Sequence, residues 1–350
     1  MDLPYAFGGP CCRGVIRSVP EDFQVEEIPA FMPDGSGEHV LLEIEKRDAN
    51  SDWVAGLLAR LAGVPRREVS YAGMKDRHAV TRQWFSVRLA GRAEPDWQAL
   101  DDADSLRVLQ ATRHRRKLRR GALRGNRFRL RVRGLTGDTG RLEETLVRLR
   151  ARGMPNGFGE QRFGRDGGNL SQALRLFAGE AGRLKRPQRG ILLSAARSLL
   201  FNRVLARRVA EGSWERLLPG ERVIFEGSRS GFLYLGDDAA AERRLQALDL
   251  HPSGPLWGRG EPGTAGAVAR LEREVLAPLA VWREGLERLG LKMERRALRA
   301  PVSGLQWSLA DGCLELEFAL PKGAYATALL RELIDYRAPS YDSDQAHLPP

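Results

Sequence analysis

The first third of the chain alternates apolar and polar positions in a way that predicts short β-strands. Period-two alternation is typical of a strand with one buried face, whereas a helix repeats every three to four residues. A proline-containing turn over 20–22 separates the first two predicted strands. The predicted strands span 14–19, 23–28, 40–44 and 84–89.

One helix interrupts this series. Ser51 is the expected N-cap, and the helix ends near Gly63 and Pro65, residues that stop helices. Its apolar stripe consists of Val54, Leu57, Leu58 and Leu61. A further helix is predicted over 141–150.

The middle of the chain has a different pattern, and the alternation returns near the end. We predict a Gly-rich basic loop over 154–169, a long helix over 194–210, an irregular segment over 252–266, a strand over 314–320 and a helix over 325–336. Two strand-rich ends around a different middle predict one domain interrupted by an insertion. The first domain would comprise 1–153 plus 301–350, and the insertion 154–300.

The charge is concentrated in one segment. The 350 residues include 56 Lys and Arg against 45 Asp and Glu, a net charge of +11. Residues 113–133 contain 11 of these cations and no acid, so the remainder is balanced at 45 against 45. Because 42% of the residues are hydrophobic, the chain can bury a core, and the basic excess favours a polyanionic partner such as nucleic acid.

The end of that segment predicts a strand with two unlike faces. Over 126–133 the residues Phe128, Leu130 and Val132 share one face, and Arg127, Arg129, Arg131 and Arg133 share the other. Four guanidiniums repel one another unless phosphates lie across them, so the missing acids favour contact with RNA or DNA. A solvated strand face remains the alternative. The expected contacts to the RNA backbone are Arg115, Arg116, Lys117, Arg127 and Arg129.

Several classes of protein are disfavoured. Cys11, Cys12 and Cys313 show neither a disulfide framework nor zinc spacing, and the five histidines form no cluster, so we expect no metal. No apolar run approaches the roughly 18–20 residues of a membrane span. The start of the chain lacks the basic and apolar regions of a secretory signal, so we expect a cytoplasmic protein.

A polar cluster over 71–83, YAGMKDRHAVTRQ, lies between the first predicted helix and the strand over 84–89. Asp76 stands between Lys75 and Arg77, and such neighbours keep a carboxylate ionised and suited to act as a nucleophile or base. An ordinary loop aspartate in surface ion pairs is the alternative. The sequence shows no Ser/His/Asp or paired-carboxylate arrangement that competes with Asp76.

These residues resemble the TruD family of tRNA pseudouridine synthases. The cluster over 71–83 looks like the family signature, and further blocks similar to the family follow its order along nearly the whole chain. These blocks are PEDFQVEE (20–27), GSGEH (35–39), RHRRKLRRGALRGNRF (113–128), PNGFGEQRFGRDGGNL (155–170), LSAARSLLFN (193–202) and LPKGAYATALLREL (320–333).

The resemblance implies a mixed α/β (α+β) fold of pseudouridine-synthase type, with a mixed or antiparallel sheet flanked by helices and a family-specific α/β insertion, the TRUD domain. It implies isomerisation of a uridine in tRNA, uridine 13 in bacterial members, without cofactor or metal. Asp76 would be the catalytic aspartate, acting by covalent addition or through a glycal intermediate. The expected partner is tRNA, with no membrane and no obligate protein partner, and the protein is expected to be a monomer.

The resemblance also assigns supporting residues. Arg17 and Lys75 would assist Asp76, Phe23 would stack on the target base, and Asn126 and Phe128 would form the base pocket. A base extruded from folded RNA needs an aromatic surface, and an amide offers both a donor and an acceptor to uracil. Without the resemblance, Phe23 and Phe128 would be assigned to the core.

One position departs from the family pattern. Gly157 stands where a second aromatic residue is expected before Phe158, which predicts looser packing there. Two competing functions are open: a non-catalytic RNA-binding or chaperone protein, and a metal-dependent nuclease. Asp76 with its basic partners disfavours the first, and the absence of clustered carboxylates or histidines disfavours the second.

Overall fold

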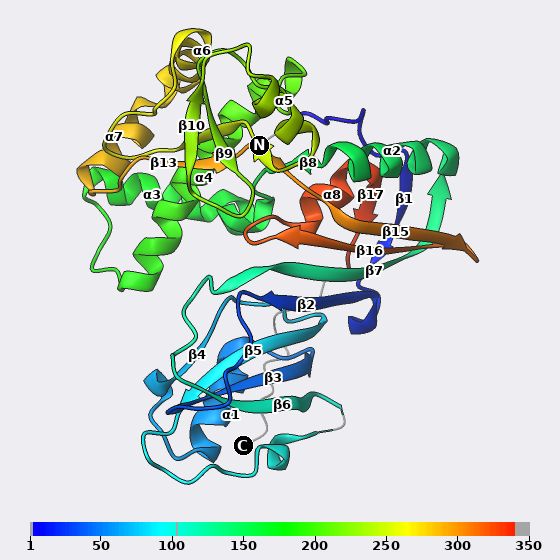
Figure 1. Cartoon of the computed structure of the whole chain (residues 1–350), viewed down its shortest axis with the longest axis vertical. Coiled ribbons are helices and arrows are strands. Elements are labelled where there is room, and N and C mark those ends of the chain that lie inside the picture. The colour runs from blue at the N-terminus through cyan, green and yellow to red at the C-terminus, as the bar shows by residue number, and fades with distance from the viewer. Residues whose placement is uncertain (1–2, 103, 340–350) are drawn as a thin grey trace. The chain divides into compact units, whose positions relative to one another are not determined.

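The computed structural model describes residues 3–102 and 104–339 (Figure 1). Its contacts divide the chain into two compact units. We call one the helical unit, which comprises Met1–Pro10, Gly140–Val302 and Gly323–Leu333. The other is the sheet unit, which comprises Cys11–Thr139, Ser303–Lys322 and Ile334–Pro350. The predicted insertion over 154–300 lies wholly in the helical unit, which also takes in segments that we assigned to the first domain.

Ten strands of the described residues form one sheet in the sheet unit. They are β1 (Cys12–Ile16), β2 (Phe23–Pro29), β3 (His39–Arg47), β4 (Val69–Tyr71), β5 (Val80–Arg88), β6 (Leu106–His114), β7 (Leu123–Gly137), β15 (Ser303–Ala310), β16 (Cys313–Pro321) and β17 (Ile334–Arg337). The order is β15-β16-β7-β2-β5-β3-β6, with β4 beside β5, and β1 between β7 and β17. The pairs β2–β5 and β1–β17 are parallel and the others antiparallel, which confirms the predicted mixed sheet.

The helix α1 (Ser51–Leu61) covers one face of this sheet. Val54 and Leu58 pack on Val40, Leu42 and Ile44, the side chains of alternate positions along β3. These five side chains are fully buried. The alternation of the sequence therefore determines which face of β3 lies against the helix.

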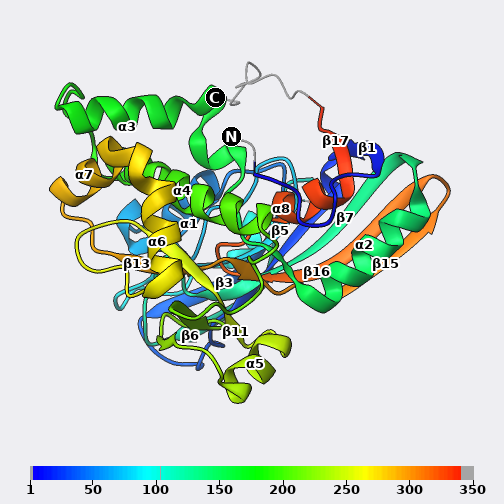
Figure 2. The same ribbon diagram turned by 90° about the horizontal axis from the view of Figure 1, so that it is seen from above.

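The helical unit is built around the long helix α4, against which α3, α6 and α7 pack (Figure 2). Its helices are α2 (Thr139–Arg152, whose first residue belongs to the sheet unit), α3 (Gly168–Ala178), α4 (Arg186–Ala210), α5 (Ala239–Gln246), α6 (Gly266–Leu276), α7 (Ala280–Arg288) and α8 (Ala326–Leu333). Its strands are β8 (Met154–Pro155), β9 (Glu221–Phe225), β10 (Gly231–Tyr234), β11 (Leu250–His251), β12 (Ser253–Leu256), β13 (Glu294–Ala297) and β14 (Arg299–Ala300).

Short 3-10 helices connect several of these elements. They are η1 (Pro20–Asp22), η2 (Arg66–Glu68), η3 (Trp97–Leu100), η4 (Glu160–Phe163), η5 (Arg165–Gly167) and η6 (Ala277–Leu279). The predicted turn over 20–22 is thus one 3-10 turn.

Three element boundaries differ from the prediction. The first strand ends at Ile16, because Arg17 adopts a left-handed backbone with φ of 58°. The N-cap of α1 is Asn50, whose side chain accepts a hydrogen bond from the N–H of Asp52, so Ser51 is the first helical residue. The last predicted helix ends at Leu333, and the chain continues as a strand.

Two features of the helical unit also correct the prediction. Helix α4 begins at Arg186, before the predicted start at 194, and the segment over 252–266 contains strand β12. Gly157 is buried, and a Cβ placed on it would lie 2.7 Å from Cδ2 of Leu3. The glycine therefore marks close packing, not looser packing.

Candidate active site

Asp76 lies in a loop over 72–79, between strands β4 and β5 of the sheet unit. Side chains from α1 and β5 form hydrogen bonds with the backbone of this loop. The Nε2 of Gln83 donates to the carbonyl of Gly73, and its Oε1 accepts from the hydroxyl of Ser51 at 2.8 Å. The same hydroxyl accepts from the backbone N–H of Lys75 at 3.4 Å. Because Gln83 and Ser51 are buried, these hydrogen bonds connect the loop to the core at Gly73 and Lys75.

The carboxylate of Asp76 is paired with Arg17, as the resemblance implies. Nη2 of Arg17 lies 3.1 Å from Oδ2 of Asp76, and the two side chains are 22% and 32% exposed. Within residues 3–102 and 104–339, no hydrogen bond or ion pair reaches Oδ1 of Asp76. One carboxylate oxygen is therefore fixed by the guanidinium, and the other is not bound by any of the described residues.

The left-handed backbone of Arg17 directs its side chain across Phe23. The guanidinium carbon lies 4.0 Å from the centroid of the Phe23 ring, which is within cation–π range. Phe23 meets Phe128 edge to face, with the ring centroids 6.3 Å apart, and Phe128 stacks on Phe318 at 5.3 Å. Both predicted pocket aromatics are more than nine-tenths buried, so they also belong to the core.

Lys75, the second residue expected to assist Asp76, does not pair with its carboxylate, and its ammonium has other partners. Its Nζ lies 2.8 Å from Oε1 of Glu27, and these side chains are 6% and 1% exposed. The ammonium also donates to Oδ1 of Asn126 at 2.7 Å.

The predicted site residues nevertheless form a closed ring of contacts. Asp76 bonds Arg17, which lies on Phe23, which meets Phe128. Two residues before Phe128 on the same face of β7 is Asn126, which bonds Lys75, the neighbour of Asp76 in the chain. The structure thus brings together the carboxylate, its basic partner, two aromatic rings and an amide.

Two buried charges beside this ring, Glu27 and Lys46, were not predicted from the sequence. Lys46 is fully buried, and its Nζ donates to the carbonyl oxygens of Ala49 at 2.7 Å and Asp76 at 3.4 Å. Burial lowers the pKa of Lys46 to about 8, while the charge of Asp76 acts in the opposite direction. Both residues occupy strand positions where the alternation calls for an apolar side chain, and this was the signal that could have revealed them.

Acids compensate the row of arginines on β7, contrary to the expectation from the sequence. This row consists of Arg127, Arg129, Arg131 and Arg133. Each guanidinium is paired with a carboxylate from a neighbouring element. The pairs are Arg127–Glu26 at 3.6 Å, Arg129–Glu317 at 3.1 Å, Arg131–Glu315 at 2.5 Å and Arg133–Asp22 at 2.7 Å. The segment itself contains no acid, but strand pairing supplies acids that are distant in the sequence.

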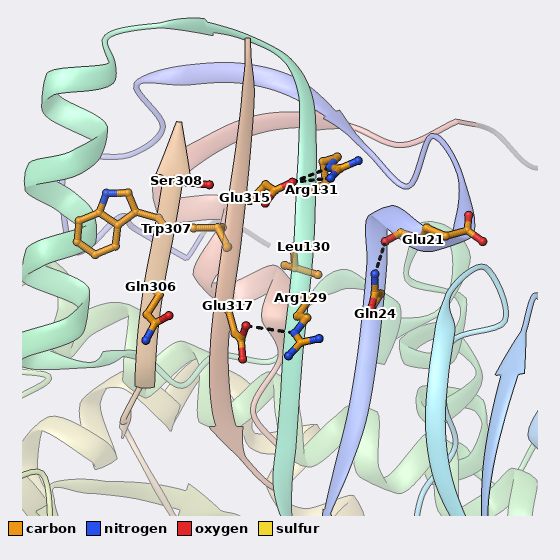
Figure 3. A pocket seen from close by; sticks show the side chains of 11 residues that line it. Glu21, Gln24, Arg129, Leu130, Arg131, Gln306, Trp307, Ser308, Glu315 and Glu317 are labelled. Atoms are coloured by element: carbon orange, nitrogen blue, oxygen red, sulfur yellow. Dashed lines mark hydrogen bonds and ion pairs between the residues drawn. The ribbon is translucent and has the colours of Figure 1, made fainter. Parts of the chain in front are cut away.

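The arginine row also lies on the face of β7 opposite that of Asn126 and Phe128, because side chains alternate along a strand. A hollow of about 550 Å³ lies over this face. Figure 3 shows that Arg129 and Arg131 line it beside Glu317 and Glu315. Asp76 is not among the residues that line it. This hollow and the candidate site are therefore separate features of the sheet unit.

The cations of the basic segment that lack a carboxylate partner lie mainly in the loop between β6 and β7. Within the described residues, Arg116, Lys117, Arg119 and Arg120 of this loop are exposed and have no carboxylate partner, and the same holds for Arg124, the second residue of β7. Arg115 is paired with Asp34 at 3.5 Å, and Lys117 donates to the carbonyl of Arg67. The N–H of Gly121 donates to the carbonyl of Ala72 at 2.7 Å, which fixes this basic loop to the start of the Asp76 loop.

Two further properties concern the described residues, 3–102 and 104–339. They contain no group of three or more His, Cys, Asp or Glu side chains placed to hold a metal ion. None of the helices in these ranges is long and apolar enough to cross a membrane.

Comparison with known structures first defines the class of fold. The crystal structure of the Methanosarcina mazei protein described as tRNA pseudouridine synthase D aligns with a TM-score of 0.71, at 23% identity, over 95% of this chain and 98% of that one. At this identity the likeness shows a shared fold, with the mixed sheet and helices described above.

Sequence comparison identifies the family. The family model described as tRNA pseudouridine synthase D (TruD) matches residues 3–174 and 167–333. The tRNA pseudouridine synthase D of Methylococcus capsulatus is 55% identical over 96% of this chain and 95% of its own length. That of Nitrosococcus oceani is 50% identical over 94% and 93%. The chain belongs to the TruD family of tRNA pseudouridine synthases.

Proposed function

We propose that this protein isomerises uridine 13 of tRNA to pseudouridine, with Asp76 as the catalytic carboxylate. The family and the names of the relatives support pseudouridine synthesis on tRNA. The observation that carries the assignment of Asp76 is the closed ring of contacts, in which one carboxylate oxygen of Asp76 has no partner among the described residues and the ring also holds two aromatic side chains and an amide. We also propose that the protein acts as a cytoplasmic monomer without cofactor, metal or obligate protein partner.

The reaction is an isomerisation, so its atoms balance within the nucleoside. The bond from C1′ to the base nitrogen breaks, the base rotates, and a bond from C1′ to a ring carbon forms, while the proton of that carbon is lost and the nitrogen gains one. Asp76 either adds to the sugar or base and is released again when the bond from C1′ to carbon has formed, or removes a ribose proton that returns to the ribose as that bond forms. In both routes Arg17 holds the carboxylate in place through the bond to Oδ2.

The same arrangement supports roles for the other residues. Phe23 and Phe128 supply the apolar wall beside the base, and Asn126 supplies polar contacts to its edge. For the RNA backbone, Arg116 and Lys117 have no carboxylate partner among the described residues and belong to the loop fixed next to Asp76. Arg115, Arg127 and Arg129 would have to exchange a carboxylate for a phosphate, so we expect smaller contributions from them.

Pseudouridine mapping on unmodified tRNA tests the proposal. After carbodiimide labelling, primer extension should stop one nucleotide 3′ of position 13 with the wild type and show no such stop with Asp76→Ala. Asp166→Asn is the matched control, because Asp166 is an exposed loop aspartate of the helical unit, with its side chain 94% exposed. It should leave the stop unchanged. Tight binding without any stop would favour a non-catalytic RNA-binding protein, and an active Asp76→Asn would refute the assignment of the catalytic residue.

A further inference from the structure

The ion pair between Lys75 and Glu27 is almost completely buried, and the proposed reaction does not use it. Its side chains are 6% and 1% exposed, and Asp76 has its own partner in Arg17. A buried ion pair adds little stability compared with apolar side chains of similar size, because both charges lose their hydration. The pair therefore needs another explanation.

The second contact of the ammonium supplies one. Nζ of Lys75 donates to Oδ1 of Asn126 at 2.7 Å. An ammonium has three donors and no acceptor, so it bonds only the oxygen end of an amide and fixes which end is which. The Nδ2 group is the other end of the Asn126 amide, and it has no hydrogen-bond partner among the described residues. It remains available as a donor to a ligand.

Glu27 in turn is fixed by the sheet. Its Oε2 accepts from the backbone N–H of Trp84 on β5 at 3.0 Å, and its Oε1 faces Lys75. Glu27 on β2 also lies directly opposite Asn126 on β7 in the strand register. The orientation of the amide is thus determined by strand backbone, through a carboxylate and an ammonium that are both shielded from water.

From this geometry we infer that Glu27 and Lys75 are positioning residues that make the proposed pocket selective for uracil over cytosine. The inference rests on the proposed function, since it concerns how the same site recognises its base. Uracil carries a carbonyl at position 4, where cytosine carries an amino group. A fixed Nδ2 donor pairs with the carbonyl and opposes the amino group, whereas an amide free to rotate accepts either base.

Equilibrium binding tests this inference. Two tRNAs that differ only in uracil or cytosine at the target position are compared, with every protein carrying Asp76→Asn so that neither RNA is converted. With Glu27 and Lys75 intact, the Kd for the uracil form should be about tenfold lower, the discrimination expected of a matched hydrogen bond. Glu27→Gln combined with Lys75→Met removes both charges together, and the ratio should fall to about one.

A second variant and a control separate positioning from general damage. Asn126→Asp keeps the contact with Lys75 but replaces the donor by an acceptor, so the preference should shift towards cytosine. Lys46→Met removes another buried lysine, whose hydrogen bonds within the described residues are to backbone oxygens, and should leave the ratio at about ten.

Any of three results would overturn the inference. The first is a ratio of the two Kd values near one in the protein that carries only Asp76→Asn. The others are an unchanged ratio in the folded double variant and retention of the uracil preference by Asn126→Asp. Pseudouridine formation by the wild type, measured in parallel, separates the two proposals. If product forms and the ratio does not respond, only the positioning role is wrong. If the wild type forms no product, both proposals are wrong.

Discussion

Arg17 lies across the ring of Phe23, with its guanidinium carbon 4.0 Å from the ring centroid, while it also bonds Asp76 at 3.1 Å. The guanidinium thus occupies a face of the ring on which we expect the target base to stack. A base that uses this face must displace or slide along the guanidinium. We therefore expect placement of the base and the orientation of the carboxylate to be coupled through this one side chain.

Replacement of Arg17 tests this coupling. Arg17→Lys keeps a positive charge near Asp76 but loses the planar surface over Phe23, so we expect the single-turnover rate to fall about tenfold. Arg17→Gln loses the charge as well and should lower the rate about 100-fold, with little change in the Kd for tRNA. Single-turnover assays with saturating enzyme measure both. A wild-type rate in Arg17→Gln would show that Asp76 needs no partner.

The basic loop and the arginine row should contribute differently to RNA affinity. Replacing Arg116, Arg119 and Arg120 by glutamine removes three cations without a carboxylate partner among the described residues, and should reduce the slope of log Kd against log salt by about 2. Replacing Arg127, Arg129 and Arg131 removes three that are already paired, so the slope should change less. Filter binding between low and moderate salt compares the two sets. Equal effects would contradict the distinction.

Two neighbouring arginines of α4 provide a matched test of buried and exposed ion pairs. Arg208 and Glu221 are 1% and 0% exposed, whereas Arg207 and Glu211 are 54% and 38% exposed. Arg208→Gln leaves Glu221 buried without its partner and should lower the free energy of unfolding by about 3–5 kcal/mol. Arg207→Gln should cost about 0.5 kcal/mol or less. Denaturant unfolding followed by circular dichroism gives both values, and similar losses would contradict the prediction.

Lys46 should make stability increase with pH in the alkaline range. Its pKa is lowered from 10.5 to about 8 in the folded protein, chiefly by burial. Between these values the unfolded chain binds the proton and the folded chain does not, so the free energy of unfolding rises with pH. The full effect is about 3 kcal/mol, complete near pH 10.5 and absent below pH 8.

The difference in stability between the wild type and Lys46→Met isolates this effect from other groups that titrate at high pH. It should shift in favour of the wild type as the pH rises from 8 to 10.5. Urea unfolding at several pH values measures it. A constant difference would mean that Lys46 titrates equally in both states.

The alternation of apolar and polar residues predicted the buried face of the sheet, but it did not predict the ion pairs of the sheet. The apolar face of β7 was predicted correctly because Phe128 and Leu130 report it directly. The partners of Arg129 and Arg131 were not, because they come from β16, almost 190 residues further along the chain. Strand pairing over such a distance depends on the whole fold, and no single segment records it.

The site shows the same division between local and distant information. The contact between Arg17 and Asp76 came from the family resemblance, and the structure contains it. The contact of Lys75 with Glu27 was missed, although Glu27 continues the series Phe23 and Val25 on the buried face of β2. A charged residue at a strand position that faces the core predicts a buried partner, although the sequence does not identify that partner.

The connectivity of the sheet has a consequence for biosynthesis. Strand β7 in the middle of the sheet pairs with β16, and β1 pairs with β17, so both depend on residues after 312. During synthesis from the N-terminus, one edge of β7 stays without its partner until the chain has been made past residue 312. Long-range pairing of this kind folds slowly and exposes strand edges. The newly made chain therefore acquires an intact Phe128–Phe318 stack only after β16 has been synthesised, and chains truncated before β16 should be inactive even when Asp76 and its loop are present.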